Sequence, residues 1–128
     1  MAQKVTAALD VTLLEPERQA LETKPTENLE AYQYYLQGND YYNRGYAKKD
    51  NEIAIQMYEK AIELDSNFAL AYAKLSHVHS RYYWFFYDRT DARLAKAQEA
   101  VDKAFKLKPG LPEAHSALGF YYYWGHLD

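Results

Sequence analysis

The chain contains AIQMYEKAIELDSN at residues 54–67 and AQEAVDKAFKLKPG at residues 97–110, and these two stretches align without a gap. Each is followed at the same distance by a second matching stretch, ALAYAKLSHVH from Ala69 and PEAHSALGFYY from Pro112. An earlier copy of the second stretch, AYQYYLQGNDY, starts at Ala31. Small and aromatic residues that recur at fixed spacing over a unit of two helices indicate a stacked-helix repeat. The sequence therefore predicts an all-α fold.

The repeated pattern resembles the tetratricopeptide repeat, whose unit carries an aromatic residue, Leu-Gly and Tyr on its first helix and Ala, an aromatic residue, Ala and Pro on its second. The residues in these places are Tyr34, Gly38, Tyr41, Ala54, Tyr58 and Ala61, then Tyr72, Leu75, Ser76, His79, Ala97, Val101, Ala104 and Pro109, then His115, Leu118, Gly119 and Tyr122. The resemblance implies a right-handed superhelical array of antiparallel helix pairs. The expected repeats are residues 28–66, 67–109 and a truncated 110–128, which is about two and a half units, after a helical junction segment at residues 1–27.

Caps and breakers predict where the helices begin and end. We expect helices over residues 28–44, from 50 or 51 to 64, 67–86, from 90 or 91 to 107, and from 112 onward, and no strands. Gly45 and the sequence Lys108-Pro109-Gly110 are typical of helix ends, and Pro112 suits a first helical turn. The aromatic run at residues 81–88 either extends its helix and packs inward or forms an exposed docking patch.

Composition excludes several classes of function. The 128 residues include no cysteine, so no disulfide framework, thiolate metal site or cysteine nucleophile is available. A net charge of -3 gives no general attraction for nucleic acid or an anionic membrane. No stretch approaches the roughly 18 apolar residues of a membrane span, and no signal peptide is recognisable. We expect a cytoplasmic protein without direct membrane insertion; a periplasmic location stays open if a parent protein is membrane-anchored.

The polar residues do not predict an active site. His77 and His79 are two positions apart, so a helix directs them to different faces and they cannot share a metal ion. Pairs of carboxylates such as Glu99 and Asp102 are typical of solvated helix faces. The five glycines lie apart and form no phosphate-binding loop. We therefore expect no enzyme activity, no cofactor and no metal.

The resemblance implies a partner-binding groove lined by the first helix of each repeat. The second, fifth, ninth and twelfth positions of the units point into such a groove. The candidate residues are Tyr32, Tyr35, Asn39, Tyr42, His77, Ser80, Phe120 and Tyr123, and the same positions include Leu70, Ala73, Glu113 and Ser116. Tyrosine suits peptide recognition because it combines rigid contact area with a polar tip. The alternative is that these tyrosines pack between helices. Some family members bind a C-terminal carboxylate here; only Asn39 matches their residues, so we do not expect that ligand.

These observations favour a protein-interaction or regulatory module that binds a peptide or a partner domain. Residues 2–38 resemble the junction before the repeats of bacterial multidomain signalling proteins, such as adenylate cyclases and serine/threonine kinases. Because the third unit lacks a second helix, we expect a fragment of a longer protein. The alternative function is self-association into a homo-oligomer through the C-terminal helix, with Tyr122 and Trp124 as the contact residues. A catalytic function is the third hypothesis and lacks a recognisable reactive pair.

Overall fold

The computed structural model describes residues 25–126. This part of the chain is all-α, as predicted, and no strand occurs within it. Its helices are α3 (Leu29–Tyr42), α4 (Lys48–Leu64), α5 (Ala69–Trp84), α6 (Asp91–Leu107) and α7 (Pro112–Gly125). The junction helix expected before residue 25 lies outside the described residues.

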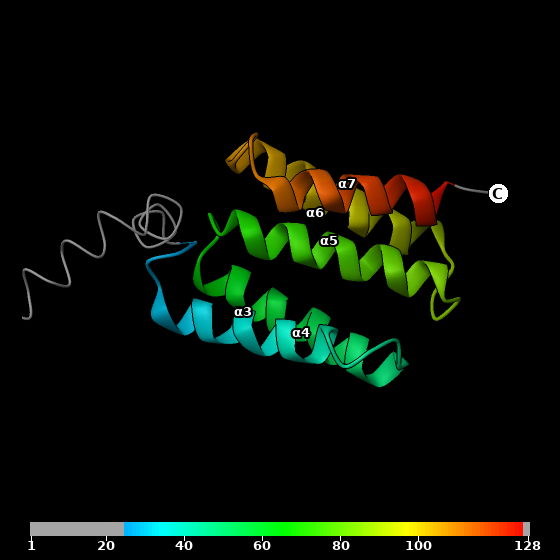
Figure 1. The fold of residues 1–128 in the computed structure, drawn as a ribbon, viewed down its shortest axis with the longest axis horizontal. Helices are drawn as coiled ribbons and strands as arrows, with labels where there is room; N and C mark the ends of the chain where they lie inside the picture. Colours follow the sequence, from blue (N-terminus) through cyan, green and yellow to red (C-terminus); the bar gives the residue numbers. More distant parts are fainter. Residues whose placement is uncertain (1–24, 127–128) are drawn as a thin grey trace, which may run out of the picture.

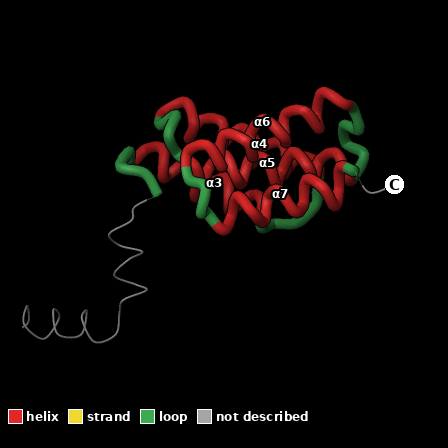
Figure 2. The backbone as a smooth tube through the Cα atoms, turned by 90° about the horizontal axis from the view of Figure 1, so that it is seen from above, coloured by secondary structure: helices red, strands yellow, loops and turns green. Residues whose placement is uncertain are grey.

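Helix α5 is the centre of the arrangement. It packs against α4, α6 and α7, while α3 packs against α4 and α6 packs against α7. In Figure 1, α3, α5 and α7 lie toward the viewer, and α4 and α6 lie behind them. Figure 2 shows the same arrangement from above, with α5 between the other helices. We call the surface formed by α3, α5 and α7 the A face.

Side-chain caps explain where two of the helices begin. Asn28 accepts a hydrogen bond from the Ala31 amide at 2.9 Å and starts α3. Thr90, one of the two predicted caps of α6, accepts from the Arg93 amide at 3.1 Å. The prediction for α4 was wrong, because that helix begins at Lys48, ahead of Asn51. Asn51 does not cap α4: it is fully buried and hydrogen-bonds to an arginine of α5.

In the first two units, the small residue of the repeat pattern lies where the paired helices touch. A Cβ atom at Gly38 on α3 would lie 2.6 Å from the Tyr58 ring of α4. The equivalent residue on α5, Ser76, donates a hydrogen bond to the Ala97 carbonyl of α6 at 2.7 Å. The third equivalent, Gly119 on α7, has open space where its Cβ would be. The first two units therefore use the same position for helix-to-helix contact.

The aromatic run at the end of α5 divides between the interior and the surface. The helix ends at Trp84, two residues earlier than expected, and Phe86 has a positive φ of 63° and is 72% exposed. Tyr82 is buried, and its ring centroid lies 5.3 Å from that of Tyr87. The Tyr87 hydroxyl donates to the Tyr46 carbonyl, so the run closes over the α3–α4 loop.

Candidate partner-binding face

An aromatic cluster crosses all three helices of the A face. The Tyr42 hydroxyl from α3 lies 2.9 Å from Nε2 and 3.1 Å from Nδ1 of His77 on α5. On the other side, the Phe120 ring of α7 stacks on His77, with centroids 4.1 Å apart and planes 16° from parallel. Trp124 completes the cluster 4.5 Å from Phe120 and 5.5 Å from His77. These four side chains are half-buried, so part of each ring is open to solvent.

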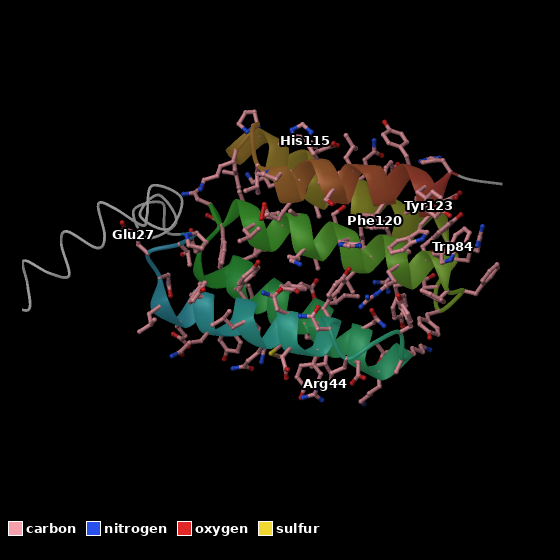
Figure 3. All side chains as sticks on the ribbon, viewed as in Figure 1. Glu27, Arg44, Trp84, His115, Phe120 and Tyr123 are labelled. Atoms are coloured by element: carbon pink, nitrogen blue, oxygen red, sulfur yellow. The ribbon has the colours of Figure 1, made fainter. Side chains whose placement is uncertain are left out.

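Further aromatic residues extend the cluster toward the C-terminal ends of α5 and α7. The rings of Trp84 and Tyr123 lie 6.1 Å apart, and Tyr123 is 57% exposed. Figure 3 shows these two residues with Phe120 at the same end of the A face. Exposed aromatic surface of this kind is typical of protein-interaction sites.

Two cations approach the Tyr42 ring. The Arg81 guanidinium carbon lies 3.8 Å from the ring centroid and the Lys74 ammonium nitrogen lies 5.1 Å from it. An aromatic ring attracts cations through its quadrupole, which stabilises both positions. Arg81 is 4% exposed and donates to Asn51 Oδ1 and to the Tyr42 carbonyl. It therefore holds the end of α3 and the start of α4 against α5.

Burial and the neighbouring positive charges keep His77 neutral. Burial, followed by the positive charges of Lys74 and Arg81, lowers the pKa of His77 to about 3. Burial also lowers the pKa of Lys74, although Glu113 opposes that effect. Because His77 is uncharged at neutral pH, one of its ring nitrogens accepts the Tyr42 hydroxyl proton, and the ring serves as a neutral stacking surface.

The structure brings only part of the expected groove set to the open surface. Tyr42, His77, Phe120 and Tyr123 lie on the A face as described above. Tyr32 is half-buried and its ring lies 6.1 Å from that of Tyr35. The half-buried Asn39 accepts a hydrogen bond from the Tyr58 hydroxyl at 2.6 Å. The Asn39 side-chain oxygen is thus already engaged within the fold.

Two of the expected groove residues belong to the interior. Tyr35 is 6% exposed and packs against Tyr58 and Phe68, with ring centroids 5.9 and 5.1 Å away. Ser80 is fully buried, and its hydroxyl has no hydrogen-bond partner in the described part of the chain. Tyr35 is therefore part of the α3–α4–α5 core, and Ser80 is buried within the described part of the chain. They do not present a surface to a partner.

The two residues expected to mediate self-association lie in different surroundings. Tyr122 is 59% exposed and neighbours His126, at a centroid distance of 5.8 Å. Trp124 instead belongs to the aromatic cluster on the A face. Positions two apart on a helix point in nearly opposite directions, so the two residues cannot form one contact surface.

Two cationic residues beside His77 were not predicted: Lys74, which is half-buried on the A face, and Arg81, which is buried. They flank His77 at spacings of three and four, which places all three on one stripe of a helix. That spacing was the available signal. Ala73 and Ser80, the predicted groove positions, precede Lys74 and Arg81 by one residue and are buried, as Arg81 is too.

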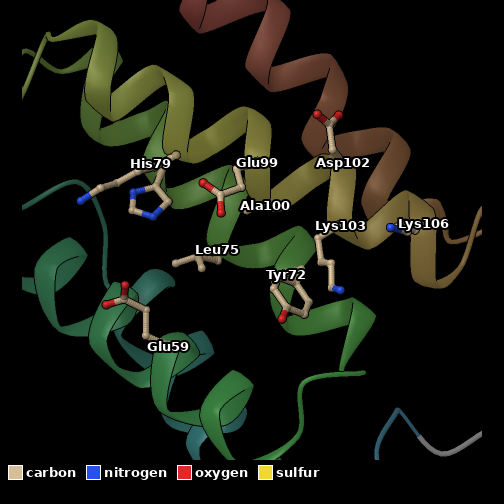
Figure 4. A pocket seen from close by; sticks show the side chains of 10 residues that line it. Glu59, Tyr72, Leu75, His79, Glu99, Ala100, Asp102, Lys103 and Lys106 are labelled. Atoms are coloured by element: carbon tan, nitrogen blue, oxygen red, sulfur yellow. The ribbon is translucent and has the colours of Figure 1, made fainter.

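A separate cleft of about 520 Å³ opens between α4 and α6, with α5 as its floor (Figure 4). Its lining residues are Glu59, Tyr72, Leu75, His79, Lys96, Glu99, Ala100, Asp102, Lys103 and Lys106. His79 accepts a hydrogen bond from Arg93 at 2.9 Å, and burial followed by nearby cations lowers its pKa to about 3. Acidic and basic residues alternate around the cleft, so its charge does not favour a partner of one sign.

The described residues contain no group of three or more histidines, cysteines or carboxylates placed to hold a metal ion. Among the helices of residues 25–126, none is long and apolar enough to cross a membrane. Comparison of the chain with protein-family models, with curated proteins and with solved structures finds no match. The fold and the A face define the class of this protein: it is all-α, with paired helices and an aromatic surface beside a half-buried lysine.

Proposed function

We propose that this protein is a non-enzymatic interaction module that binds a peptide or partner segment along the A face. The observation that carries the proposal is the aromatic cluster of Tyr42, His77, Phe120 and Trp124, which spans three helices and remains partly open. Helices hold these rings in place before a partner arrives, which reduces the entropy lost on binding. Large aromatic side chains contribute most of the binding energy at many protein interfaces.

In this proposal the helices form a right-handed tetratricopeptide-like array. Support comes from the equivalent contacts of Gly38 with Tyr58 and of Ser76 with Ala97, which repeat one packing rule in successive units. The resemblance of residues 2–38 to a junction in bacterial signalling proteins supports the proposal that the module belongs to a larger signalling chain. A protein or peptide is the proposed partner, and nucleic acid is not.

A peptide-display selection tests the proposed binding. Peptides recovered on the immobilised protein would be synthesised, and their dissociation constants would be measured by fluorescence anisotropy against wild type and two variants. Phe120→Ala removes a ring of the cluster and is expected to weaken binding at least tenfold, or about 1.4 kcal/mol. Tyr122→Ala, on the same helix but outside the cluster, is the matched control and should change binding less than about twofold. Equal effects of the two variants, at unchanged helical content by circular dichroism, would exclude the A face as the binding surface.

Self-association through α7 is a second candidate function. It is favoured by the 59% exposure of Tyr122 beside the open position at Gly119. Light scattering after size exclusion, over a concentration series, would show a dimer that dissociates on dilution, and Tyr122→Glu would shift it to monomer. A monomer at every concentration would rule out this alternative.

A further inference from the structure

The centre of the A face carries more positive than negative charge. Lys74, His77 and Arg81 form one stripe of α5, and His77 is neutral, so the stripe has two positive charges. Glu113 of α7 is the acidic group that acts on Lys74. Within residues 25–126, no carboxylate forms an ion pair with Lys74 or Arg81. The net charge around the stripe is therefore one positive unit.

The partners of Arg81 leave its charge uncompensated. Its guanidinium donates to the Asn51 side-chain oxygen and to the Tyr42 carbonyl, and both acceptors are neutral. These bonds satisfy the donor geometry but do not cancel the charge. A buried cation without a counter-ion is unfavourable, and an anion that binds nearby would relieve that cost.

Lys74 is the accessible part of this positive region. Its side chain is half-buried, and no described residue accepts a hydrogen bond from its ammonium group. The group has three donors and lies beside the Tyr42 ring, between α3 and the Glu113 end of α7. A ligand oxygen that reaches Lys74 would also lie next to the aromatic cluster.

This inference rests on the proposed function and specifies the chemistry of the partner. We propose that the segment bound on the A face is acidic, and that an aspartate or glutamate side chain of the segment binds the Lys74 ammonium group while neighbouring side chains contact the rings. One carboxylate carries one negative charge and neutralises the region. A phosphate group carries close to two negative charges, so it exceeds what the region needs, and Glu113 would repel it more strongly.

A peptide selection in which the peptides have no free C-terminal carboxylate tests the inference, because only side-chain carboxylates can then bind. A random library is fused through its C-terminus to a phage coat protein, so that no peptide presents a free terminal carboxylate. Selections are run on wild type, on Lys74→Met and on Lys103→Met. The last variant removes a lysine of the α4–α6 cleft and is the matched control, because it changes the net charge by the same amount.

In peptides recovered on wild type and on Lys103→Met, we expect aspartate and glutamate to be enriched beside aromatic residues. Peptides recovered on Lys74→Met should lack this enrichment. In a synthetic, C-terminally amidated peptide, replacing the selected glutamate by glutamine should weaken binding about tenfold, as expected for loss of a charge-assisted hydrogen bond. The same replacement should have no effect on binding to Lys74→Met. A phosphoserine in place of the glutamate should bind no more tightly.

The outcomes distinguish the two proposals. Recovered peptides that depend on Phe120 but show no acidic enrichment would overturn the acidic partner and leave the binding face intact. Tighter binding of the phosphoserine peptide would overturn the assignment to a carboxylate. Failure to recover any peptide above an uncoated control would overturn both proposals.

Discussion

Adding one methyl group at equivalent positions of two repeat units should change stability in opposite directions. In Gly38→Ala, the new Cβ atom would lie 2.6 Å from Cε1 and 2.7 Å from Cδ1 of Tyr58. The ring would have to move by about 0.8 Å to reach ordinary contact at 3.4 Å. Tyr58 resists this movement, because it is fully buried and its hydroxyl bonds to Asn39 at 2.6 Å. In Gly119→Ala, the new methyl group meets no atom within 4 Å.

The magnitudes follow from two competing terms. Alanine in place of glycine within a helix contributes about 1 kcal/mol of stability, and overpacking a rigid core costs about 1–3 kcal/mol. Because the buried ring resists movement, we expect an overpacking cost in the upper part of this range, about 2–3 kcal/mol, so that Gly38→Ala lowers the free energy of unfolding by about 1–2 kcal/mol. Gly119→Ala should raise it by about 0.5–1 kcal/mol, since only the propensity term applies.

Urea unfolding followed by circular dichroism would measure both changes at one pH. Thermal unfolding should agree, with a midpoint roughly 4–8 °C lower for each kcal/mol lost. If Gly38→Ala stabilised the protein as much as Gly119→Ala does, the close contact between α3 and α4 would not exist in solution. The assignment of one packing rule to successive units would then fail.

The remaining predictions concern buried polar groups. Burial lowers the pKa of His79 to about 3 in the folded chain. Between about pH 6.5 and pH 3, the unfolded chain therefore binds a proton at this residue that the folded chain excludes. As a result, the free energy of unfolding falls as the pH falls through this range. His79→Gln should reduce that slope by about 1.4 kcal/mol per pH unit in urea titrations, and an unchanged slope would contradict the assigned burial. For Arg81, replacement by methionine leaves the acceptors on Asn51 and Tyr42 unpaired and should cost about 2–4 kcal/mol. Asn51→Leu should then lower the free energy of unfolding less in the Arg81→Met protein than in wild type. If the two stability losses were strictly additive, the hydrogen bonds between these residues would be excluded.

Local signals in the sequence predicted the helices well. Thr90 at the start of α6, Leu107 at its end and Pro112 at the start of α7 all match the structure, because caps and proline act within one turn of the chain. The start of α4 was misplaced where tertiary structure overrode a local preference. Asn51 was expected near the helix start as a cap, but its side chain is recruited by an arginine 30 residues away.

The candidate site was less predictable than the helices. A repeat register assigns positions to a face of a helix, but it does not say how far a neighbouring helix covers each of those positions. On α5, the register placed His77 correctly on the A face, but Ala73 and Ser80 are buried and Lys74 is half-buried.

By itself, the sequence determined the all-α class and the approximate positions of the helices, because periodicity, caps and breakers act between residues close in the chain. Only the tertiary structure decided which side chains are open to a partner. Tyr35 is enclosed by rings from α4 and from the start of α5, while Lys74 remains accessible between α3 and α7. The distinction depends on which faces of separate helices meet, and helix periodicity does not contain that information.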